Sequence, residues 1–358
     1  MTKRILVMPD SFKGTMSSET VCRVMKEVLQ EKGAQVKALP VADGGEGTID
    51  CFLHAFEGTK RMAYVNGPFG EPIEGYYGAF DGFAVVESAV AAGFRTDGRR
   101  DPSVASTYGV GQLIRCAIED GYENIILGMG GSCTNDGGAG MAAALGTVFK
   151  DADGISFIPT GSTLDKIAEV DKKPLGDVKI TAMCDVDNVL HGPRGAAYVF
   201  APQKGADEKM VEMLDAGLKA YAEAIKDNLG IDVSETRGGG AAGGLGAAAS
   251  VFLDAELKAG IDVILDLISF EELVKDYDFI ITGEGCLDEQ SLSGKVAIGI
   301  ARRAGNTPVI AVVGDCKGDR NEYHKEGISE IWVVKPEGGY GPDPDYEDEL
   351  RNTILRNI

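Results

Sequence analysis

Acidic residues next to glycine recur where the hydrophobic segments of this sequence end. They occur at six places: Asp10; Asp43 and Glu46; Asp136; Asp185 and Asp187; Glu284 and Asp288; and Asp315. Each one alone is consistent with a helix cap or a turn, where aspartate is favoured. Buried carboxylates are costly unless they are paired, protonated or bound to a cation, and a Mg²⁺-nucleotide supplies a cation that prefers oxygen ligands. The recurrence therefore indicates a metal-assisted site.

The segment Gly128–Gly140, with the sequence GMGGSCTNDGGAG, has the composition of a phosphate-binding loop. It follows a predicted strand and opens a predicted helix, where amides point outward and bind phosphate. Glycine allows the backbone to approach a ligand, and Ser132 and Thr134 add hydroxyl donors. The loop is not of the Walker type, because no Gly-Lys-Ser/Thr follows, and a structural tight turn is the alternative. A second tract, 238–246, is equally consistent with close helix packing and with ligand contact.

Basic residues beside glycines are few in this acidic chain. Lysine and arginine number 35 against 56 acidic residues, which gives a net charge of −21. That balance excludes a basic nucleic-acid-binding face and an anionic membrane surface as partner. The candidates for holding a carboxylate substrate or a triphosphate are Lys13, Arg194, Lys204 and Lys295, although solvated loop residues are the alternative for each.

The elements that position these residues predict an α/β fold built on buried parallel strands. The chain opens with a strand at 5–8, a helix from its cap Ser17 to Gly33, and a strand at 35–41. In open parallel sheets, ligands bind at the carboxyl ends of the strands, where the acidic residues stand. Further strands are expected at 125–127, 179–183, 279–282, 309–313 and 331–334, extended segments of a hairpin or small mixed sheet at 60–65, 72–80 and 82–87, and helices at 107–121, 207–228, 238–249 and from 294.

The length of 358 residues favours two domains. Both ends of the chain have the pattern of buried-strand α/β units, with no obvious linker between them. We expect residues 1–88 and 265–358 to form one discontinuous domain, and residues 89–264 to form an inserted α/β domain. A ligand cleft is expected between the two.

Several classes of protein are not supported. No run of about 18 apolar residues predicts a membrane span, and the amino-terminal segment lacks the apolar length of a secretory signal. The seven cysteines are scattered without a CxxC pair, which fits a reducing, cytoplasmic location. The three histidines lie far apart in the sequence, which disfavours a histidine metal site or a Ser-His-Asp triad.

An ordered set of segments resembles the glycerate kinase family, of the bacterial type that produces 2-phosphoglycerate. The resemblance covers nearly the whole chain, through PDSFKGTMSS, ADGGEGT, GPFGEPI, VESAVAAG, TYGVGQLI, GMGGSCTNDGGAGM, CDVDN, GPRGAAYVFAPQKGA, GGGAAGGLGAA, DFIITGEGCLDEQSLSGK and PVIAVVGD. It implies ATP-dependent phosphorylation of D-glycerate, usually at the 2-hydroxyl, with Mg²⁺. It also implies two α/β domains, one of them flavodoxin- or Rossmann-like and built from both chain ends. The oligomeric state stays open between monomer and homodimer.

Within this reaction, the residues divide into three groups of hypotheses, because phosphoryl transfer depends on positioning and charge neutralisation. The ATP phosphates would be bound by Gly130, Gly131, Ser132, Thr134, Asn135, Gly137, Gly138 and Lys204. Mg²⁺ would be held by Asp187 and Glu284 first, and by Asp43, Glu46 and Asp288. Lys13, Arg194 and Lys295 would hold the glycerate carboxylate or neutralise the γ-phosphate, with Asp187 also in the catalytic set. Asp10 or Asp136 would orient the attacking hydroxyl and accept its proton.

The sequence departs from the family pattern at three points. Cys286 stands where the family commonly has arginine, Cys133 replaces a small residue of the loop, and the tail after Val334 looks shorter than the family's helical ending. Two alternatives to glycerate phosphorylation stay open. One is a kinase of another small sugar or polyol, and the other is a two-domain binding protein without chemistry.

Overall fold

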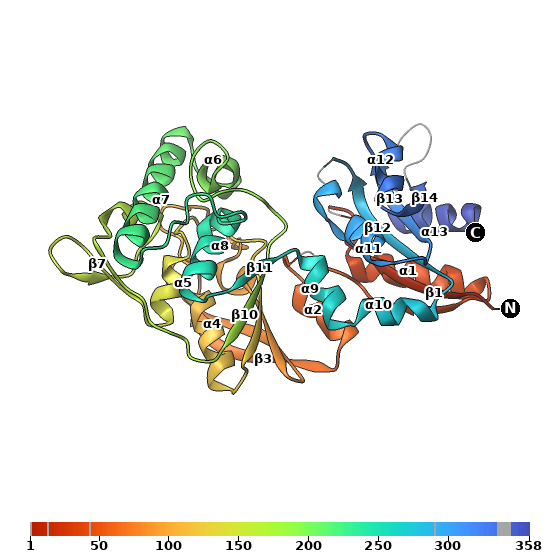
Figure 1. The fold of residues 1–358 in the computed structure, drawn as a ribbon, viewed down its shortest axis with the longest axis horizontal. Coiled ribbons are helices and arrows are strands. Elements are labelled where there is room, and N and C mark those ends of the chain that lie inside the picture. The colour runs from red at the N-terminus through yellow and green to blue at the C-terminus, as the bar shows by residue number, and fades with distance from the viewer. Residues whose placement is uncertain (1, 13, 43, 290, 335–344) are drawn as a thin grey trace. The chain divides into compact units, whose positions relative to one another are not determined.

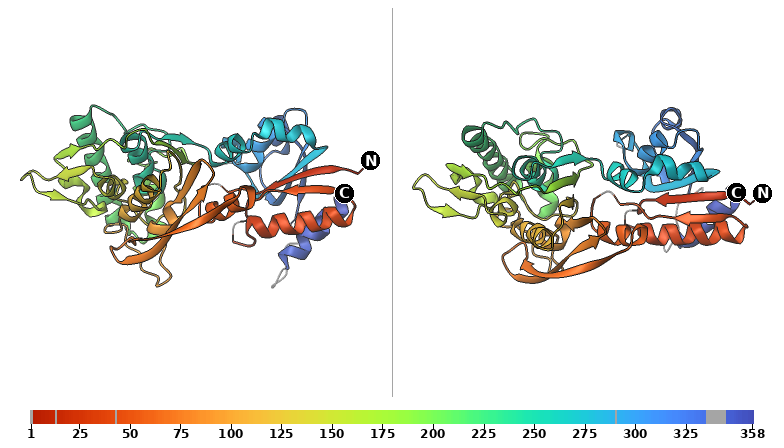
Figure 2. Two further views of the ribbon diagram at one scale, coloured as in Figure 1. Left: turned by 90° about the horizontal axis from the view of Figure 1, so that it is seen from below. Right: turned by 60° about the horizontal axis from the view of Figure 1, so that its bottom comes forward.

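The chain divides into two compact units in a computed structural model that describes residues 2–12, 14–42, 44–289, 291–334 and 345–358 (Figure 1). The first unit combines residues 1–43, 50–55 and 259–358, and the second combines 44–49 and 56–258. Both units are α/β, and the first draws on both ends of the chain (Figure 2). Two predicted site residues, Lys13 and Asp43, lie outside the described residues.

The sheet of the first unit has the strand order β14-β13-β12-β1-β2. β1 (Arg4–Pro9) pairs in parallel with β2 (Gln35–Ala38) and β12 (Phe279–Leu287), and β13 (Val309–Cys316) and β14 (Ile328–Val333) follow, also in parallel. Counted along the chain, this is the flavodoxin order, 2-1-3-4-5. The order reverses between β1 and β12, and such a switch point is where doubly wound sheets bind ligands.

The helices of the first unit cover its buried strands. α1 (Ser18–Glu31) begins as predicted, because the Ser17 hydroxyl accepts a hydrogen bond from the Thr20 amide at 3.2 Å. α13 (Tyr346–Asn357) packs on α1 and belongs to the same hydrophobic core, so a helix is present in the tail, where its different sequence had put a final helix in doubt. The remaining helical segments are α9 (Gly260–Leu267), α10 (Phe270–Leu273), η3 (Val274–Asp276), η4 (Ser291–Ser293), α11 (Val296–Arg303) and α12 (Arg320–Lys325).

The sheet of the second unit is mixed, with the order β11-β10-β6-β5-β4-β3. The antiparallel β3 (Gly58–Asn66), β4 (Pro72–Phe80) and β5 (Phe83–Glu87) join the parallel β6 (Asn124–Gly128), β10 (Lys179–Met183) and β11 (Glu256–Lys258) through the β5–β6 pair. The expected domain boundary at residue 88 therefore moves toward the amino terminus, because β3 to β5 complete this sheet. A small separate sheet contains β7 (Val148–Lys150), β8 (Ser156–Phe157) and β9 (Glu169–Asp171).

The helices of the second unit surround one large hydrophobic core. They are α3 (Ser88–Ala92), α4 (Tyr108–Glu119), α5 (Ala139–Ala144), η1 (Gly161–Lys166), α6 (Ala196–Phe200), η2 (Pro202–Lys204), α7 (Glu208–Leu229) and α8 (Ala241–Phe252), while α2 (Thr48–Ala55) begins in this unit. Glu87 holds the start of α2 to β5, because its carboxylate accepts hydrogen bonds from the amides of Gly47 and Ile49. No helix in the described part of the chain is long and apolar enough to cross a membrane.

β12 and β13 extend well beyond their predicted carboxyl ends at residues 282 and 313. β12 and β13 stay paired as far as Cys286 with Asp315 and Leu287 with Cys316. Glu284 and Asp315 therefore lie inside strands rather than after them. The glycines around Glu284 looked like a turn in the sequence, but they continue the sheet because the neighbouring strand extends equally far.

Candidate active site

Asp136 is a buried carboxylate that organises the glycine-rich loop of the second unit. Its Oδ2 accepts hydrogen bonds from the Thr107 amide (2.7 Å), the Thr107 hydroxyl (2.9 Å) and the Gly140 amide (3.3 Å), and its Oδ1 accepts one from the Gly138 amide (3.1 Å). Burial raises the pKa of Asp136, and these hydrogen bonds oppose the shift. The arrangement favours a positioning role over the predicted role as proton acceptor.

Hydrogen bonds to Asp136 and Thr107 occupy the amides at the start of α5, which were expected to bind phosphate. The amides of Gly138 and Gly140 are bound by Asp136, and the Met141 amide donates to the Thr107 hydroxyl at 2.9 Å. These amides serve the protein itself, contrary to the expectation that they point outward toward phosphate. Gly138 is nevertheless required, because its backbone is left-handed at φ 71°, a region that glycine adopts without strain.

The glycines at the start of the loop allow two backbone segments to touch. A side chain at Gly130 would place its Cβ 2.6 Å from the Cα of Gly45, and the Gly130 amide donates to the Gly44 carbonyl at 3.0 Å. Glu46, which is exposed, lies beside Gly131 in this contact. Residues 44–46 of the acidic, glycine-rich motif therefore pack directly on the phosphate-type loop.

The tract from residue 238 to 246 packs against the far end of the loop. Within α8, Ala242, Gly243 and Gly244 have left-handed backbones at φ 52°, 74° and 97°. A Cβ at Gly243 would lie 2.1 Å from the Thr134 carbonyl, and the Gly243 carbonyl accepts from the Gly137 amide at 3.0 Å. Of the two interpretations left open by the sequence, these contacts support close packing.

Lys204 lies beneath the loop and joins several of the predicted ATP-binding residues. It is 2% exposed, and its ammonium donates to the Ser132 hydroxyl at 3.1 Å and the Thr134 carbonyl at 2.7 Å. Burial lowers the pKa of Lys204 to about 8. The Thr134 hydroxyl and both polar atoms of the Asn135 amide are buried, and no described residue is their hydrogen-bond partner. Hydroxyl, amide and ammonium donors are a chemistry that fits a phosphate group.

Asp187 and Arg194 are placed differently from this cluster. The Asp187 side chain is 61% exposed and forms an ion pair with Arg237, with Nε–Oδ1 at 2.6 Å and Nη2–Oδ2 at 2.8 Å. This guanidinium lowers the pKa of Asp187. Arg194 is exposed, and its backbone carbonyl accepts from the side-chain Nδ2 of Asn188 at 2.9 Å. Sequence reasoning missed Arg237, although it precedes Gly238 and meets the same criterion as the other basic residues beside glycines.

A second group of predicted residues lies in the first unit, at the switch point of its sheet. The Asp10 amide donates to the Gly283 carbonyl at 2.8 Å, which brings Asp10 next to β12. Glu284 is 5% exposed; its Oε2 accepts from the Ser291 hydroxyl at 3.0 Å, whereas its Oε1 has no hydrogen-bond partner among the described residues. Burial raises the pKa of Glu284 to about 7, while the Ser291 hydroxyl and Lys295 oppose the shift. Ser291 was missed by the sequence reasoning.

Lys295 and Asp288 complete this group. The Lys295 ammonium lies 3.6 Å from Asp288 Oδ1, and both side chains are about one-third exposed, at 36% and 34%. Asp10 and Asp288 both add to the raised pKa of Glu284, which places three carboxylates within electrostatic range of one another. The first unit therefore brings Asp10, Glu284, Asp288 and Lys295 into one group, with Glu284 inside β12 rather than at the strand end where the sequence placed it.

The proposed metal ligands are divided between the two units. In the part of the chain that the structure describes, no group of three or more His, Cys, Asp or Glu side chains is arranged to hold a metal ion. Glu46 and Asp187 belong to the second unit, whereas Glu284 and Asp288 belong to the first. Mg²⁺ commonly keeps several waters and binds one or two carboxylates together with substrate phosphates. Glu284 fits such a site, because one of its oxygens is buried and has no hydrogen-bond partner in the described part of the chain. Asp187 does not, because Arg237 forms an ion pair with its carboxylate.

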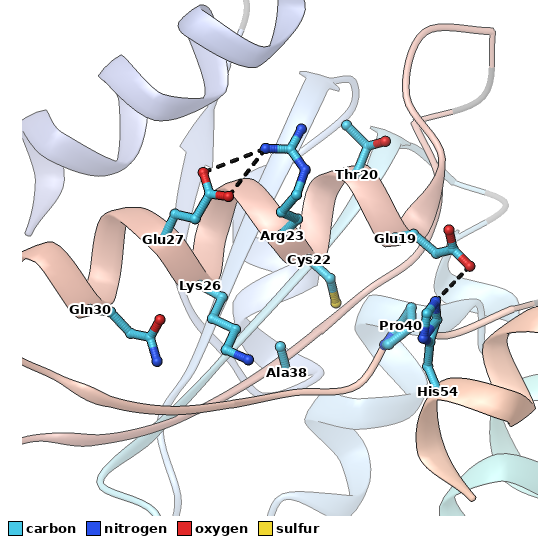
Figure 3. A pocket seen from close by; sticks show the side chains of 10 residues that line it. All are labelled: Glu19, Thr20, Cys22, Arg23, Lys26, Glu27, Gln30, Ala38, Pro40 and His54. Carbon is cyan, nitrogen blue, oxygen red and sulfur yellow. Dashed lines mark hydrogen bonds and ion pairs between the residues drawn. The ribbon is translucent and has the colours of Figure 1, made fainter. Parts of the chain in front are cut away.

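A separate hollow lies on the first unit, beside α1 (Figure 3). It has a volume of about 660 Å³ and is lined by residues that include Cys22, Lys26, Pro40 and His54. The His54 Nε2 lies 2.6 Å from Glu19 Oε1 at one end. None of the described residues predicted to bind substrate or cofactor lines this hollow.

Comparison with known proteins identifies the family. Residues 5–339 match the sequence model of the glycerate kinase family. The chain belongs to the glycerate kinase family. A glycerate kinase of Bacillus subtilis (strain 168) is 41% identical over 347 residues, covering 93% of this chain and 90% of that protein. A glycerate 2-kinase of Escherichia coli (strain K12) is 42% identical over 343 residues, covering 92% and 90%.

The fold agrees with the same family. A crystal structure assigned to glycerate kinase 2 from Salmonella typhimurium LT2 superposes with a TM-score of 0.83 at 38% sequence identity, and the match covers 99% of this chain and 94% of that one. The resemblance predicted from the sequence is therefore confirmed, together with the α/β fold class and the assignment to a family of phosphotransferases.

Cys286 is the position where this glycerate kinase family member departs from the expected arginine. It pairs in register with Asp315, and burial raises the pKa of its thiol while the nearby Lys317 opposes the shift. The Lys317 amide, which follows the last residue of β13, donates to the Leu287 carbonyl at the end of β12 at 2.8 Å. Lys317 is therefore the basic residue beside the position where arginine was expected.

Proposed function

We propose that this protein transfers the γ-phosphoryl group of ATP to the 2-hydroxyl of D-glycerate and so produces 2-phosphoglycerate. Membership of the glycerate kinase family supports the reaction, and the 42% identity to a glycerate 2-kinase supports the position. The observation that supports it most in the structure is the loop of the second unit. There, a buried ammonium and unpartnered hydroxyl and amide donors lie under a glycine-rich backbone.

The loop is the proposed site for the ATP phosphates. Ser132, Thr134, Asn135 and Lys204 supply donors, and Gly130, Gly131, Gly137 and Gly138 give the backbone the shape that presents them. Asp136 holds this shape through its four hydrogen bonds rather than by contact with substrate. Phosphoryl transfer needs such positioning more than covalent chemistry.

The first unit supplies the proposed acid–base and charge chemistry. In the transfer, the 2-hydroxyl oxygen of D-glycerate attacks the γ-phosphorus, the bond from phosphorus to the β,γ-bridging oxygen breaks, and ADP leaves. We assign the hydroxyl proton to the Asp10 carboxylate, which lies at the switch point of the sheet. Lys295 and Arg194 are assigned to the glycerate carboxylate or the γ-phosphate, as is Lys13, whose placement lies outside the described residues.

A divalent cation completes the proposal. Mg²⁺ bound with the nucleotide supplies charge neutralisation at the transferred phosphoryl group. We assign it to Glu284 and Asp288, because both lie in the group around the switch point and one oxygen of Glu284 is buried with no hydrogen-bond partner among the described residues.

A coupled assay of ADP release, with a panel of acceptors, tests this function. The expected result is ATP-dependent turnover with D-glycerate at a kcat/KM at least about 100-fold above that for sugars and polyols of similar size. A preference for a sugar or polyol would replace glycerate as substrate. Binding of glycerate without any ADP release would instead indicate a binding protein without chemistry.

Variants of the carboxylates test the roles. Asp10→Asn and Glu284→Gln are each expected to lower kcat by about 100-fold or more with the fold retained. Asp278→Asn, in the same unit, is a matched control, because its carboxylate accepts from the Arg4 amide at an exposed position. Near wild-type kcat in both site variants would refute the assignment of these carboxylates.

A further inference from the structure

Lys204 is a buried cation with more donors than the protein uses. Its side chain is 2% exposed. Its ammonium has two hydrogen-bond acceptors among the described residues, the Ser132 hydroxyl at 3.1 Å and the Thr134 carbonyl at 2.7 Å. An ammonium carries three N–H donors. One donor therefore has no acceptor among the described residues.

Unpartnered polar groups lie on the same stretch of loop. The Thr134 hydroxyl and the Asn135 amide are fully buried, and the polar atoms of both side chains have no hydrogen-bond partner in the described chain. Buried polar groups without partners are rare and costly, and they mark places that a ligand or ordered water fills. Thr134 is also the residue whose carbonyl binds Lys204, so the spare donors adjoin one another along the chain.

We propose that Lys204 binds an anionic phosphate group at this loop, and that binding of the anion is coupled to uptake of a proton by Lys204 in mildly alkaline solution. The inference deepens the proposed function, because it rests on the loop being the site of the ATP phosphates. The added property is the proton uptake, which a surface lysine with an ordinary pKa of about 10.4 would show to a much smaller extent at this pH.

The charges around Lys204 explain the coupling. Cys133 and Asp136, both in the loop, interact electrostatically with Lys204. Arg100 contacts η2, the short helix that contains Lys204, by donating to the Gln203 carbonyl at 3.2 Å. Burial lowers the pKa of Lys204 to about 8, and Cys133 and Asp136 oppose this only in part. Asp136 already accepts four hydrogen bonds. An added anion favours the charged ammonium and returns its pKa toward the ordinary value of about 10.4.

Isothermal titration calorimetry of the wild-type protein tests this directly. The probes are the non-hydrolysable ATP analogue AMP-PNP and inorganic tripolyphosphate, each titrated at fixed Mg²⁺ in buffers of different ionisation enthalpy. Near pH 9, about 0.9 proton should be taken up per ligand, because roughly one-tenth of the free Lys204 is charged there and nearly all of the bound form. Between about pH 8.5 and 9.5 the affinity should fall about sevenfold, and near pH 6.5 the Lys204-dependent uptake should be close to zero.

Substitutions assign the proton to Lys204. Lys204→Arg keeps a cation that stays charged near pH 9, so binding should persist with no uptake. Lys204→Met should weaken binding about tenfold or more at neutral pH and abolish the uptake. Lys209→Met, at an exposed position in α7, is the matched control and should behave as the wild type. Circular dichroism confirms that each variant is folded, and the wild-type titration is decisive without any variant.

Each outcome decides the matter. If AMP-PNP binds the wild type near pH 9 without proton uptake, or if Lys204→Arg retains the full uptake, the inference is wrong while the proposed function stands. If tripolyphosphate binds with uptake but AMP-PNP does not bind, the nucleotide assignment fails and the anion site stands. If neither probe binds at neutral pH, both fail.

Discussion

Replacing Asp136 with asparagine separates a residue that shapes the loop from one that accepts a proton. The carboxylate accepts four hydrogen bonds, three at Oδ2 and one at Oδ1. Asparagine has one oxygen and one NH₂ group, so it can keep the three bonds around Thr107 and Gly140 only by turning its NH₂ toward the Gly138 amide. At least one buried amide then loses its acceptor, and the remaining bonds lose their charge.

The cost follows from these bonds. A buried donor left without a partner costs about 1–3 kcal/mol, and hydrogen bonds to a charged group contribute about 1.5–3 kcal/mol. We therefore expect Asp136→Asn to lower the free energy of unfolding by about 2–4 kcal/mol. For a unit of this size, that corresponds to a Tm lower by roughly 4–16 °C. Asp187→Asn is the control, since it removes an exposed ion pair in the same unit and should cost less than about 1 kcal/mol.

Thermal unfolding followed by far-UV circular dichroism, together with ATP kinetics, provides the assay. The account predicts a lower Tm and a raised KM for ATP in Asp136→Asn. A variant with wild-type Tm and unchanged KM, but with kcat lowered by a factor of about 100 or more, would show that Asp136 accepts the proton. That result would refute the positioning role derived from its hydrogen bonds.

Three further predictions follow from particular contacts. Ala242→Gly should change the free energy of unfolding in urea by less than about 0.5 kcal/mol, because relief of the left-handed backbone at φ 52° offsets the entropic cost of glycine. In the same measurement, the control Ala216→Gly, at an exposed position of α7, should cost about 1 kcal/mol. Gly130→Ala should lower the free energy of unfolding by about 1–3 kcal/mol, because the new Cβ would lie 2.6 Å from the Gly45 Cα. Gly217→Ala is the control and should leave the free energy of unfolding nearly unchanged, because the nearest atom to its Cβ would lie at 3.3 Å. In metal-free buffer, protonated Glu284 stabilises the first unit fully below its unfolded pKa, and this contribution is lost as pH rises through about 7. The dependence of the free energy of unfolding on pH, followed by the fluorescence of Trp332 in the same unit, should therefore be weaker in Glu284→Gln than in the wild type. An equal dependence in both proteins would contradict the burial of this carboxyl.

Local patterns in the sequence predicted most of the elements. β10 matches its predicted bounds, and α1 begins at the predicted cap Ser17, because strands and caps depend on neighbouring residues. The reach of β12 through Glu284 could not be predicted, because its pairing partner β13 determines it. The boundary near residue 88 failed for the same reason, since only the pairing of β5 with β6 shows which sheet the hairpins join.

The candidate site was predictable in its residue types but not in its partners. Glycine-flanked acids and lysines identified Asp10, Glu284 and Lys204 as candidates, and the structure places Lys204 under the loop and Glu284 beside Ser291. The partners of Asp136 include Thr107, which is 29 residues away in the chain, and no local pattern marks such a contact. The ion pair of Asp187 with Arg237 spans 50 residues and was missed likewise.

NMR of the reaction product tests the central proposal most directly. After incubation of the protein with ATP, Mg²⁺ and D-glycerate, the phosphorus of the new ester should couple to the single proton on C2, and ADP should appear in equal amount. Coupling to the two protons on C3 would contradict the proposed position. An unchanged spectrum of D-glycerate, with ATP intact, would contradict the proposed reaction itself.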